Sequence, residues 1–170
     1  MLMPKPSQEI IAKRSAIVAA LQAIVPGEGV ITSDDEMRAY ETDGLSAYRQ
    51  MPLVVTLPET PEQVAAVLAY CAGAGVKVVP RGSGTSLSGG ALPLADGVIL
   101  GLGKFNRILD VDYENRCAVV QPGVTNLAIT HAVQSEGFYY APDPSSQIAC
   151  SIGGNVAENA GGVHCLKYGL

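Results

Sequence analysis

The chain has 170 residues, of which 48% are hydrophobic, and it carries a formal net charge of -5 at pH 7. This hydrophobic content is enough to build a core, so a largely disordered protein is excluded. The acidic balance excludes a long nucleic-acid interface, because such an interface needs a basic face that neutralises phosphates.

The first part of the chain, residues 1–50, is expected to form a helical segment. Apolar residues recur at helical spacing over residues 7–25, and Pro26 and Gly27 end the pattern. Residues 33–36 match a capping box, which predicts a short second helix that ends near Tyr40.

A strand, a helix and a second strand are predicted next. Residues 53–57 are apolar and have a proline on each side, as in a short buried strand. Residues 60–63 read Thr-Pro-Glu-Gln and predict a helix start, and the helix should end at Gly73 or Gly75. Residues 76–79 form the second apolar run. We expect a βαβ unit with parallel strands and a right-handed crossover.

A glycine-rich segment, residues 80–90, begins where the second strand ends, at the edge where parallel sheets bind ligands. Its glycines let consecutive N–H groups converge on an anion, and Arg81 would add a positive charge. A flexible surface loop is the alternative interpretation. The segment contains no Walker lysine, and Leu87 stands where a Rossmann loop needs its third glycine. A phosphate-binding loop of another kind therefore remains.

The second half of the chain departs from βαβ alternation. Residues 98–102 predict a strand, residues 108–112 and 117–121 a hairpin, and residues 125–136 a helix that ends at Gly137. Residues 140–162 show little regular pattern and contain a second glycine-rich segment. A long irregular segment in a compact domain is more often a binding loop than a connector.

The four cysteines have no Cys-x-x-Cys spacing, so we expect free thiols and no metal site. His164 lies beside Cys165 without a third ligand nearby, which favours loop packing over metal binding. For Asp143 a turn is the ordinary interpretation, and for Tyr139 and Tyr140 packing is expected in preference to stacking on a ligand. Glu158 and Asn159 fit a cap of the following turn as well as they fit contact with a ligand.

Four segments in the order 80–90, 121–123, 142–146 and 152–162 resemble the FAD-linked oxidase family of the vanillyl-alcohol-oxidase or PCMH type. The resemblance implies an α+β fold, with a small parallel βαβ subdomain and a second mixed α/β subdomain. The FAD-binding domain would cover residues 51–170. By family standards it would be truncated at its C-terminus and would lack the substrate cap, where the catalytic residues are expected.

The resemblance also implies three sets of FAD contacts. The set around the pyrophosphate is Arg81, Gly82, Ser83, Gly84, Thr85, Ser86, Gly89 and Gly90. The set beside the flavin and ribityl chain is Pro142, Asp143, Ser145 and Ser146. The set around the pyrophosphate and the adenosine side is Ile152, Gly153, Gly154, Asn155, Ala157, Asn159, Gly161 and Gly162. Thr85 and Ser86 occupy the neighbourhood where some relatives carry a flavin-linked histidine, so non-covalent FAD is expected.

By the same resemblance, the whole protein would oxidise a D-2-hydroxy acid such as glycolate or D-lactate and pass hydride from the α-carbon to flavin N5. Residues 139–170 are most similar to glycolate-oxidising members. A second flavin-domain subunit and an iron–sulfur subunit are the implied partners. The expected location is cytoplasmic, with contact to the inner membrane through those partners. The alternatives are a non-catalytic FAD-binding or assembly fragment and another flavin oxidoreductase of the same fold.

Overall fold

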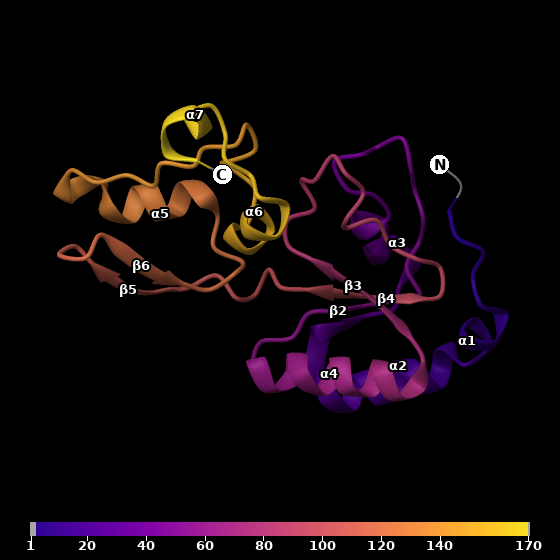
Figure 1. Ribbon diagram of the computed structural model, residues 1–170. Helices are drawn as coiled ribbons and strands as arrows, with labels where there is room; N and C mark the ends of the chain where they lie inside the picture. The colour runs from indigo at the N-terminus through magenta and orange to yellow at the C-terminus, as the bar shows by residue number, and fades with distance from the viewer. Residues whose placement is uncertain (1–2, 170) are drawn as a thin grey trace. The chain divides into compact units, whose positions relative to one another are not determined.

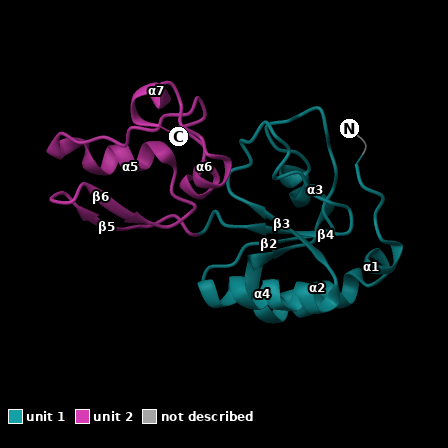
Figure 2. Cartoon of the chain, in the orientation of Figure 1, with its two compact units in different colours: residues 1–104 teal, residues 105–170 magenta. Residues whose placement is uncertain are grey.

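The computed structural model describes residues 3–169. The chain divides into two compact units, unit 1 with residues 1–104 and unit 2 with residues 105–170 (Figure 2). Unit 1 holds the parallel strands and unit 2 an antiparallel hairpin with helices, so the predicted α+β fold with two subdomains is confirmed. Residues of the predicted N-terminal helical segment supply buried side chains to the core of unit 1.

The sheet of unit 1 has the strand order β1-β2-β4-β3. Strand β1 (Val30–Ile31) is antiparallel to β2 (Val54–Thr56). Strands β2 and β3 (Lys77–Arg81) both pair in parallel with β4 (Gly97–Gly101). The two strands of the predicted βαβ unit are therefore parallel but are not neighbours. Strand β4 lies between them, which fits its burial at every residue.

Helices cover both faces of this sheet. Figure 1 shows α2 (Arg14–Ile24) and α4 (Pro61–Ala74) together on one face, and α3 (Asp34–Met37) on the other. The α2/α4 face is packed by Ile17, Leu21, Val25, Val54, Val67, Cys71, Val98 and Leu100. The α3 face is packed by Met37, Val55, Val79 and Ile99. Neighbouring strand residues thus enter opposite cores, as the two-residue period of a strand requires.

The helix predicted over residues 7–25 is two helices, α1 (Gln8–Ala12) and α2, with the break at Lys13. The Ser7 side chain caps α1 by accepting a hydrogen bond from the Ile10 N–H. The Arg14 guanidinium donates to the carbonyls of Leu53 and Thr32. The break at Lys13 separates α2, which buries Ile17 and Leu21, from α1, whose Ile10 and Ile11 pack partly buried against the same core.

Helix α4 begins as its sequence predicts. The Thr60 hydroxyl accepts from the Gln63 N–H at 3.2 Å, and Pro61 occupies the first turn. The Gln63 side chain accepts from the Glu59 N–H at 2.8 Å, one residue earlier than a standard capping box. Gly75 ends the helix in the left-handed conformation. Short 3-10 turns are found at Gly27–Gly29 and Arg38–Tyr40.

Asp96 ties α1 to the sheet. Its side chain is 3% exposed and accepts from the Lys77 ammonium at 2.8 Å and from the Ser7 N–H at 2.9 Å. Burial raises the pKa of this carboxyl, but the hydrogen bonds from Lys77 and Ser7 outweigh burial and hold the pKa below its ordinary value. Asp96 therefore stabilises unit 1 above the pKa of an unfolded aspartate, about 3.9, and loses this effect as the pH falls further.

We expect Asp96→Asn to lower the free energy of unfolding at neutral pH by about 1.5–3 kcal/mol, the usual worth of a hydrogen bond to a charged group. Urea unfolding at a series of pH values measures the loss, with Asp34→Asn at an exposed carboxylate as the control. The difference between wild type and variant should shrink as the pH falls below about 4. A difference that is the same at every pH would contradict this role.

Unit 2 is built on the hairpin of β5 (Ile108–Asp112) and β6 (Cys117–Val120). Helix α5 (Asn126–Val133) continues as a 3-10 turn (Gln134–Glu136) and ends at Gly137, which is left-handed. The predicted hairpin and helix are confirmed. The core of the unit consists of Val124, Ile129 and Ile152, with Ile108, Val120, Ala128 and Tyr140 packed against it.

The second glycine-rich segment is not irregular. It contains α6 (Ile152–Glu158), which is followed by α7 (Cys165–Tyr168). Glycine is a poor helix former, but the backbone of Gly153 lies against Pro122 and its N–H donates to the Pro122 carbonyl at 2.8 Å. This contact and the burial of Ile152 hold the helix in place. Asn159 ends it with a φ of 55°, as a helix cap.

Within residues 3–169, no helix is both long and apolar enough to cross a membrane. The same residues contain no group of three metal-binding side chains.

Candidate functional site

The first glycine-rich segment follows β3 in unit 1. Strand β3 extends to Arg81, so the loop proper covers residues 82–91. Ser83 is exposed, and Gly84, Thr85 and Ser86 are half-buried. Among the described residues, no acceptor receives a hydrogen bond from the amides of these four residues. The sequence predicts that such a loop binds an anion, and in the described part of the chain these amides have no protein acceptor that would compete with one.

Arg81 is not on the exposed side of this loop. Its residue is 8% exposed, and Nη1 donates to the Thr42 carbonyl at 2.8 Å and to the Ala91 carbonyl at 3.2 Å. The guanidinium also lies over the Tyr40 ring, 5.6 Å from its centroid. Burial lowers the pKa of Arg81, and the negative charge of Asp43 opposes this effect. The sequence singled out Arg81 as a phosphate ligand, whereas the structure shows its side chain inside unit 1.

The other two predicted contact segments lie side by side in unit 2. The Asp143 N–H donates to the Gly161 carbonyl at 3.1 Å, and Asp143 pairs in parallel with Gly162. The Pro142 carbonyl accepts from the Asn126 side-chain amide at 2.8 Å. The segment at 121–123 adjoins them through Pro122, which accepts from Gly153. Three motifs far apart in sequence thus meet in one unit.

Two buried amide side chains in unit 2 have unsatisfied atoms. Asn155 is 8% exposed and its Nδ2 has no acceptor, and Asn126 is 1% exposed and its Oδ1 has no donor, among the described residues. A buried polar atom without a partner costs about 1–3 kcal/mol, so such atoms point to a ligand or water. Asn155 was predicted as a cofactor contact. Asn126 was missed, because an asparagine in a first helical turn gives no sign of its burial.

Asp143 and His164 form a polar pair beside this junction. The His164 Nδ1 lies 2.8 Å from Asp143 Oδ2, and the His164 N–H donates to the same carboxylate at 3.4 Å. His164 is exposed, and Asp143 is its polar partner. The exposed side chain of His131 lies in the last turn of α5.

The remaining predicted residues differ in exposure. Ile152 and Gly161 are buried, Gly153, Gly154, Gly162, Pro142 and Ser146 are half-buried, and Ser145, Ala157 and Asn159 are exposed. The side chain of Ile152 belongs to the hydrophobic core, so only its backbone is left to face a ligand. In the first loop Gly89 is half-buried and Gly82 and Gly90 are exposed.

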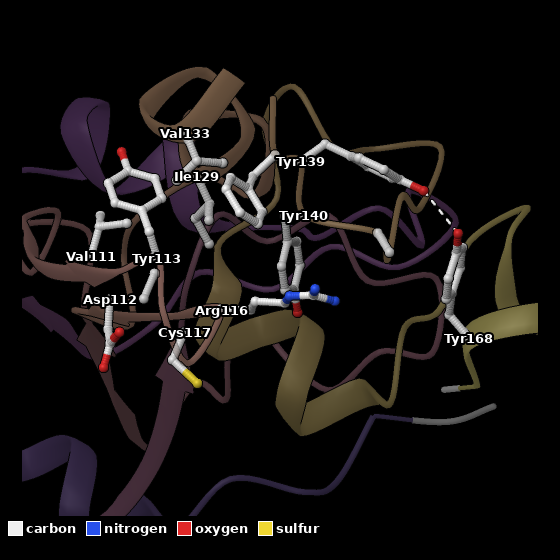
Figure 3. Close-up of a pocket in the computed structure, with 13 residues that line it drawn as sticks. Val111, Asp112, Tyr113, Arg116, Cys117, Ile129, Val133, Tyr139, Tyr140 and Tyr168 are labelled. Carbon is white, nitrogen blue, oxygen red and sulfur yellow. Dashed lines mark hydrogen bonds between the residues drawn. The ribbon is translucent and has the colours of Figure 1, made fainter. Parts of the chain in front are cut away.

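A pocket of about 350 Å³ lies elsewhere in unit 2. It is lined by the hairpin, by Ile129 and Val133 of α5, and by aromatic rings that include Tyr139, Tyr140 and Tyr168 (Figure 3). The hydroxyls of Tyr139 and Tyr168 are 2.9 Å apart, and this hydrogen bond raises the pKa of Tyr139. Tyr140 packs against the core, and burial raises its pKa. None of the predicted FAD contacts lines this pocket.

Comparison with known proteins supports the resemblance seen in the motifs. The chain is 61% identical to the glycolate oxidase subunit GlcD of Escherichia coli K12 over 92% of its length, and 44% identical to the GlcD subunit of Bacillus subtilis over 77%. It is 35% identical to a D-2-hydroxyglutarate dehydrogenase of Xanthomonas citri over 89%. These matches cover 32%, 28% and 32% of the respective relatives. The chain therefore spans about a third of their length.

Solved structures share the fold at low sequence identity. An alkyldihydroxyacetonephosphate synthase superposes with a TM-score of 0.79 at 22% identity, over 99% of this chain and 35% of the synthase. A p-cresol methylhydroxylase superposes with a TM-score of 0.71 at 24% identity, over 92% of this chain and 31% of the hydroxylase. The predicted PCMH-type fold is confirmed. Because the model of the FAD binding domain family matches residues 52–170, the chain belongs to that family.

Proposed function

We propose that the chain is the FAD-binding portion of a flavin-dependent D-2-hydroxy-acid dehydrogenase or oxidase. The observation that carries this proposal is the 61% identity to a glycolate oxidase subunit over 92% of the chain. The relatives named after D-2-hydroxyglutarate support the same class of substrate. Glycolate or D-lactate is the substrate we infer for the whole protein.

The residues present fit FAD. A pyrophosphate needs several donors, and the amides of residues 83–86 are free of protein acceptors in the described part of the chain. The buried Asn155 Nδ2 is a further donor without a partner in residues 3–169. FAD, when bound, supplies the hydride-accepting chemistry that side chains lack. The chain's own residues bind and orient the cofactor.

Non-covalent attachment follows from the composition of the first loop. Residues 82–90 contain no histidine, cysteine or tyrosine, so no strong nucleophile is available there for a flavin linkage. We assign the pyrophosphate to this loop, the flavin and ribityl chain to the segment at 142–146, and the pyrophosphate and adenosine side to the segment at 152–162. These assignments are made from the motifs.

We further propose that the whole protein works as a subunit. The Escherichia coli and Bacillus subtilis relatives are themselves named as subunits. A second flavin-domain subunit and an iron–sulfur subunit would carry electrons away, and contact of this cytoplasmic protein with the inner membrane would be made through them. Co-purification of tagged protein with an iron–sulfur protein is the test.

The substrate class is tested with the whole protein under anaerobic conditions. Glycolate, D-lactate and D-2-hydroxyglutarate are added separately, and flavin absorbance is followed. We expect at least one of these acids to bleach the flavin and the matching L-lactate or acetate control to leave it oxidised. The 170-residue chain alone should give no glycolate-dependent dye reduction, since it spans about a third of such relatives. A flavin that none of the acids reduces would contradict the proposal.

A further inference from the structure

A buried polar cluster lies beneath the first loop in unit 1. Asp43 is 6% exposed and Arg81 is 8% exposed. The Asp43 carboxylate accepts from the Leu45 N–H at 2.8 Å and from the Ala91 N–H at 3.4 Å. Arg81 donates to the carbonyls of Thr42 and Ala91. Ala91 therefore bonds to both charged side chains and closes the loop onto residues 42–45.

The backbones in this cluster touch directly. A Cβ on Gly44 would lie 2.6 Å from the Ser86 carbonyl oxygen and 2.7 Å from that of Thr85. Gly84, with a φ of 71°, lies so close to the Arg81 guanidinium that a Cβ there would overlap it. The backbone of residues 42–45 thus packs against residues 84–86, whose amides donate to no acceptor among the described residues.

The burial of Arg81 argues against a direct role in binding phosphate. Its guanidinium is engaged by two carbonyls and has the negative charge of Asp43 close by. A charge used in this way offers little attraction to a ligand outside the loop. A nearby carboxylate would repel an anionic ligand. The arrangement is instead suited to holding the loop in one conformation.

We propose that Asp43 and Arg81 are positioning residues that clamp residues 82–91 onto residues 42–45 and thereby present the loop amides to the FAD pyrophosphate. The proposal rests on the proposed FAD-binding function of the loop. It extends the cofactor site to residues 42–45, which lie before the part of the chain matched by the family model, residues 52–170.

Asp43→Asn tests the clamp because a direct role of Asp43 at the ligand and a role through the loop predict opposite changes in FAD affinity. If Asp43 acted directly on the ligand, removal of its charge would leave FAD affinity equal or increase it. If it acts through the loop, Asn places an NH₂ group against the Ala91 or Leu45 N–H, and FAD affinity should fall by roughly tenfold or more, or about 1.4 kcal/mol. Titration followed by flavin fluorescence measures this affinity.

A second readout needs no FAD. Hydrogen exchange of the free protein should become faster in residues 82–91 in Asp43→Asn, with exchange in α4 unchanged. Arg81→Lys should behave like Asp43→Asn, because a lysine keeps the charge but its ammonium ends one atom short of the Nη1 that donates to both carbonyls, and it lacks the planar group over the Tyr40 ring. Gly44→Ala should also weaken FAD binding, and Gly103→Ala, where a Cβ meets no atom within 4 Å, is its control.

Unchanged exchange in the loop together with equal or tighter FAD binding would overturn the clamp. Full FAD affinity in Arg81→Lys would also overturn it, since charge alone would then suffice. A wild-type protein that binds no FAD would refute the proposed function, but the exchange experiment would still decide whether the clamp holds the loop. Unchanged circular dichroism in each variant ensures that loss of binding is not loss of folding.

Discussion

Gly162→Ala should weaken FAD binding strongly and loosen the junction between the two contact segments of unit 2. Gly162 has a φ of 80° and pairs with Asp143, and an added Cβ would overlap the Asp143 carbonyl group. The left-handed conformation alone costs a non-glycine residue about 1–2 kcal/mol. The overlap adds to this cost, because the backbone of Asp143 cannot move aside as a flexible side chain would.

Gly137→Ala is the matched control for this variant. Gly137 has a φ of 79°, and nothing lies within 4 Å of the position of its Cβ. It should therefore show the conformational cost without the overlap. We expect FAD affinity to fall at least roughly tenfold more in Gly162→Ala than in Gly137→Ala, a difference of about 1.4 kcal/mol. Equal effects at the two sites would mean that the close approach to Asp143 does not matter for the cofactor.

Asn126→Asp should have the second large effect, on the free energy of unfolding, although it only replaces the side-chain NH₂ group with an oxygen atom. Asn126 is 1% exposed, and its amide donates to the Pro142 carbonyl at 2.8 Å. A carboxylate in its place would face a carbonyl oxygen and lie buried without a cation. Breaking a buried polar interaction in this way typically costs about 3–5 kcal/mol. We expect a loss of this order in the free energy of unfolding of unit 2.

The pH dependence of the Asn126→Asp variant tests whether the buried charge causes its loss of stability. Burial raises the pKa of such a carboxyl, and the protonated acid can again donate to the Pro142 carbonyl. The deficit should therefore shrink as the pH is lowered from about 7 to 5. Gln134→Glu makes the same chemical change at an exposed residue after α5 and should cost less than about 0.5 kcal/mol. A deficit that does not depend on pH would show that packing, and not the charge, is responsible.

Much of the local structure could be predicted because it depends on neighbouring residues. The Thr60 cap and the left-handed Gly75 define α4 within a few residues of sequence. In the hairpin of β5 and β6, the strand residues and the turn residues that connect them are close together in the sequence. The four motifs, read in order, also led to the FAD binding domain family. These features need no knowledge of distant contacts.

The features that could not be predicted depend on distant contacts. Strand β4 lies between β2 and β3, and each of its residues is buried there. The order of the strands along the chain does not reveal this position. Helix α6 forms around Gly153 because Pro122, which is 31 positions earlier in the sequence, lies against it. The amide of Asn126 is buried beneath Pro142. Local propensity is overridden at each of these places by tertiary packing.

Arg81 shows how a side chain within a motif can face a different way from the one that its residue type suggests. An arginine at the start of a glycine-rich loop suggests a phosphate ligand, because guanidinium groups suit phosphate oxygens. Successive side chains of a strand point to opposite faces of the sheet. The face on which the last side chain lies therefore depends on the residue at which the strand ends. Strand β3 includes Arg81 and turns it inward, toward Asp43 and Thr42.

Non-covalent FAD binding is the property on which the proposed role most directly depends. The purified whole protein is incubated with FAD, freed of unbound cofactor by gel filtration and precipitated with acid, and the flavin in supernatant and pellet is identified by mass. We predict a stoichiometric amount of FAD in the supernatant and none attached to the polypeptide. A protein that retains no flavin, or a flavin that stays bound to the precipitated chain, would contradict it.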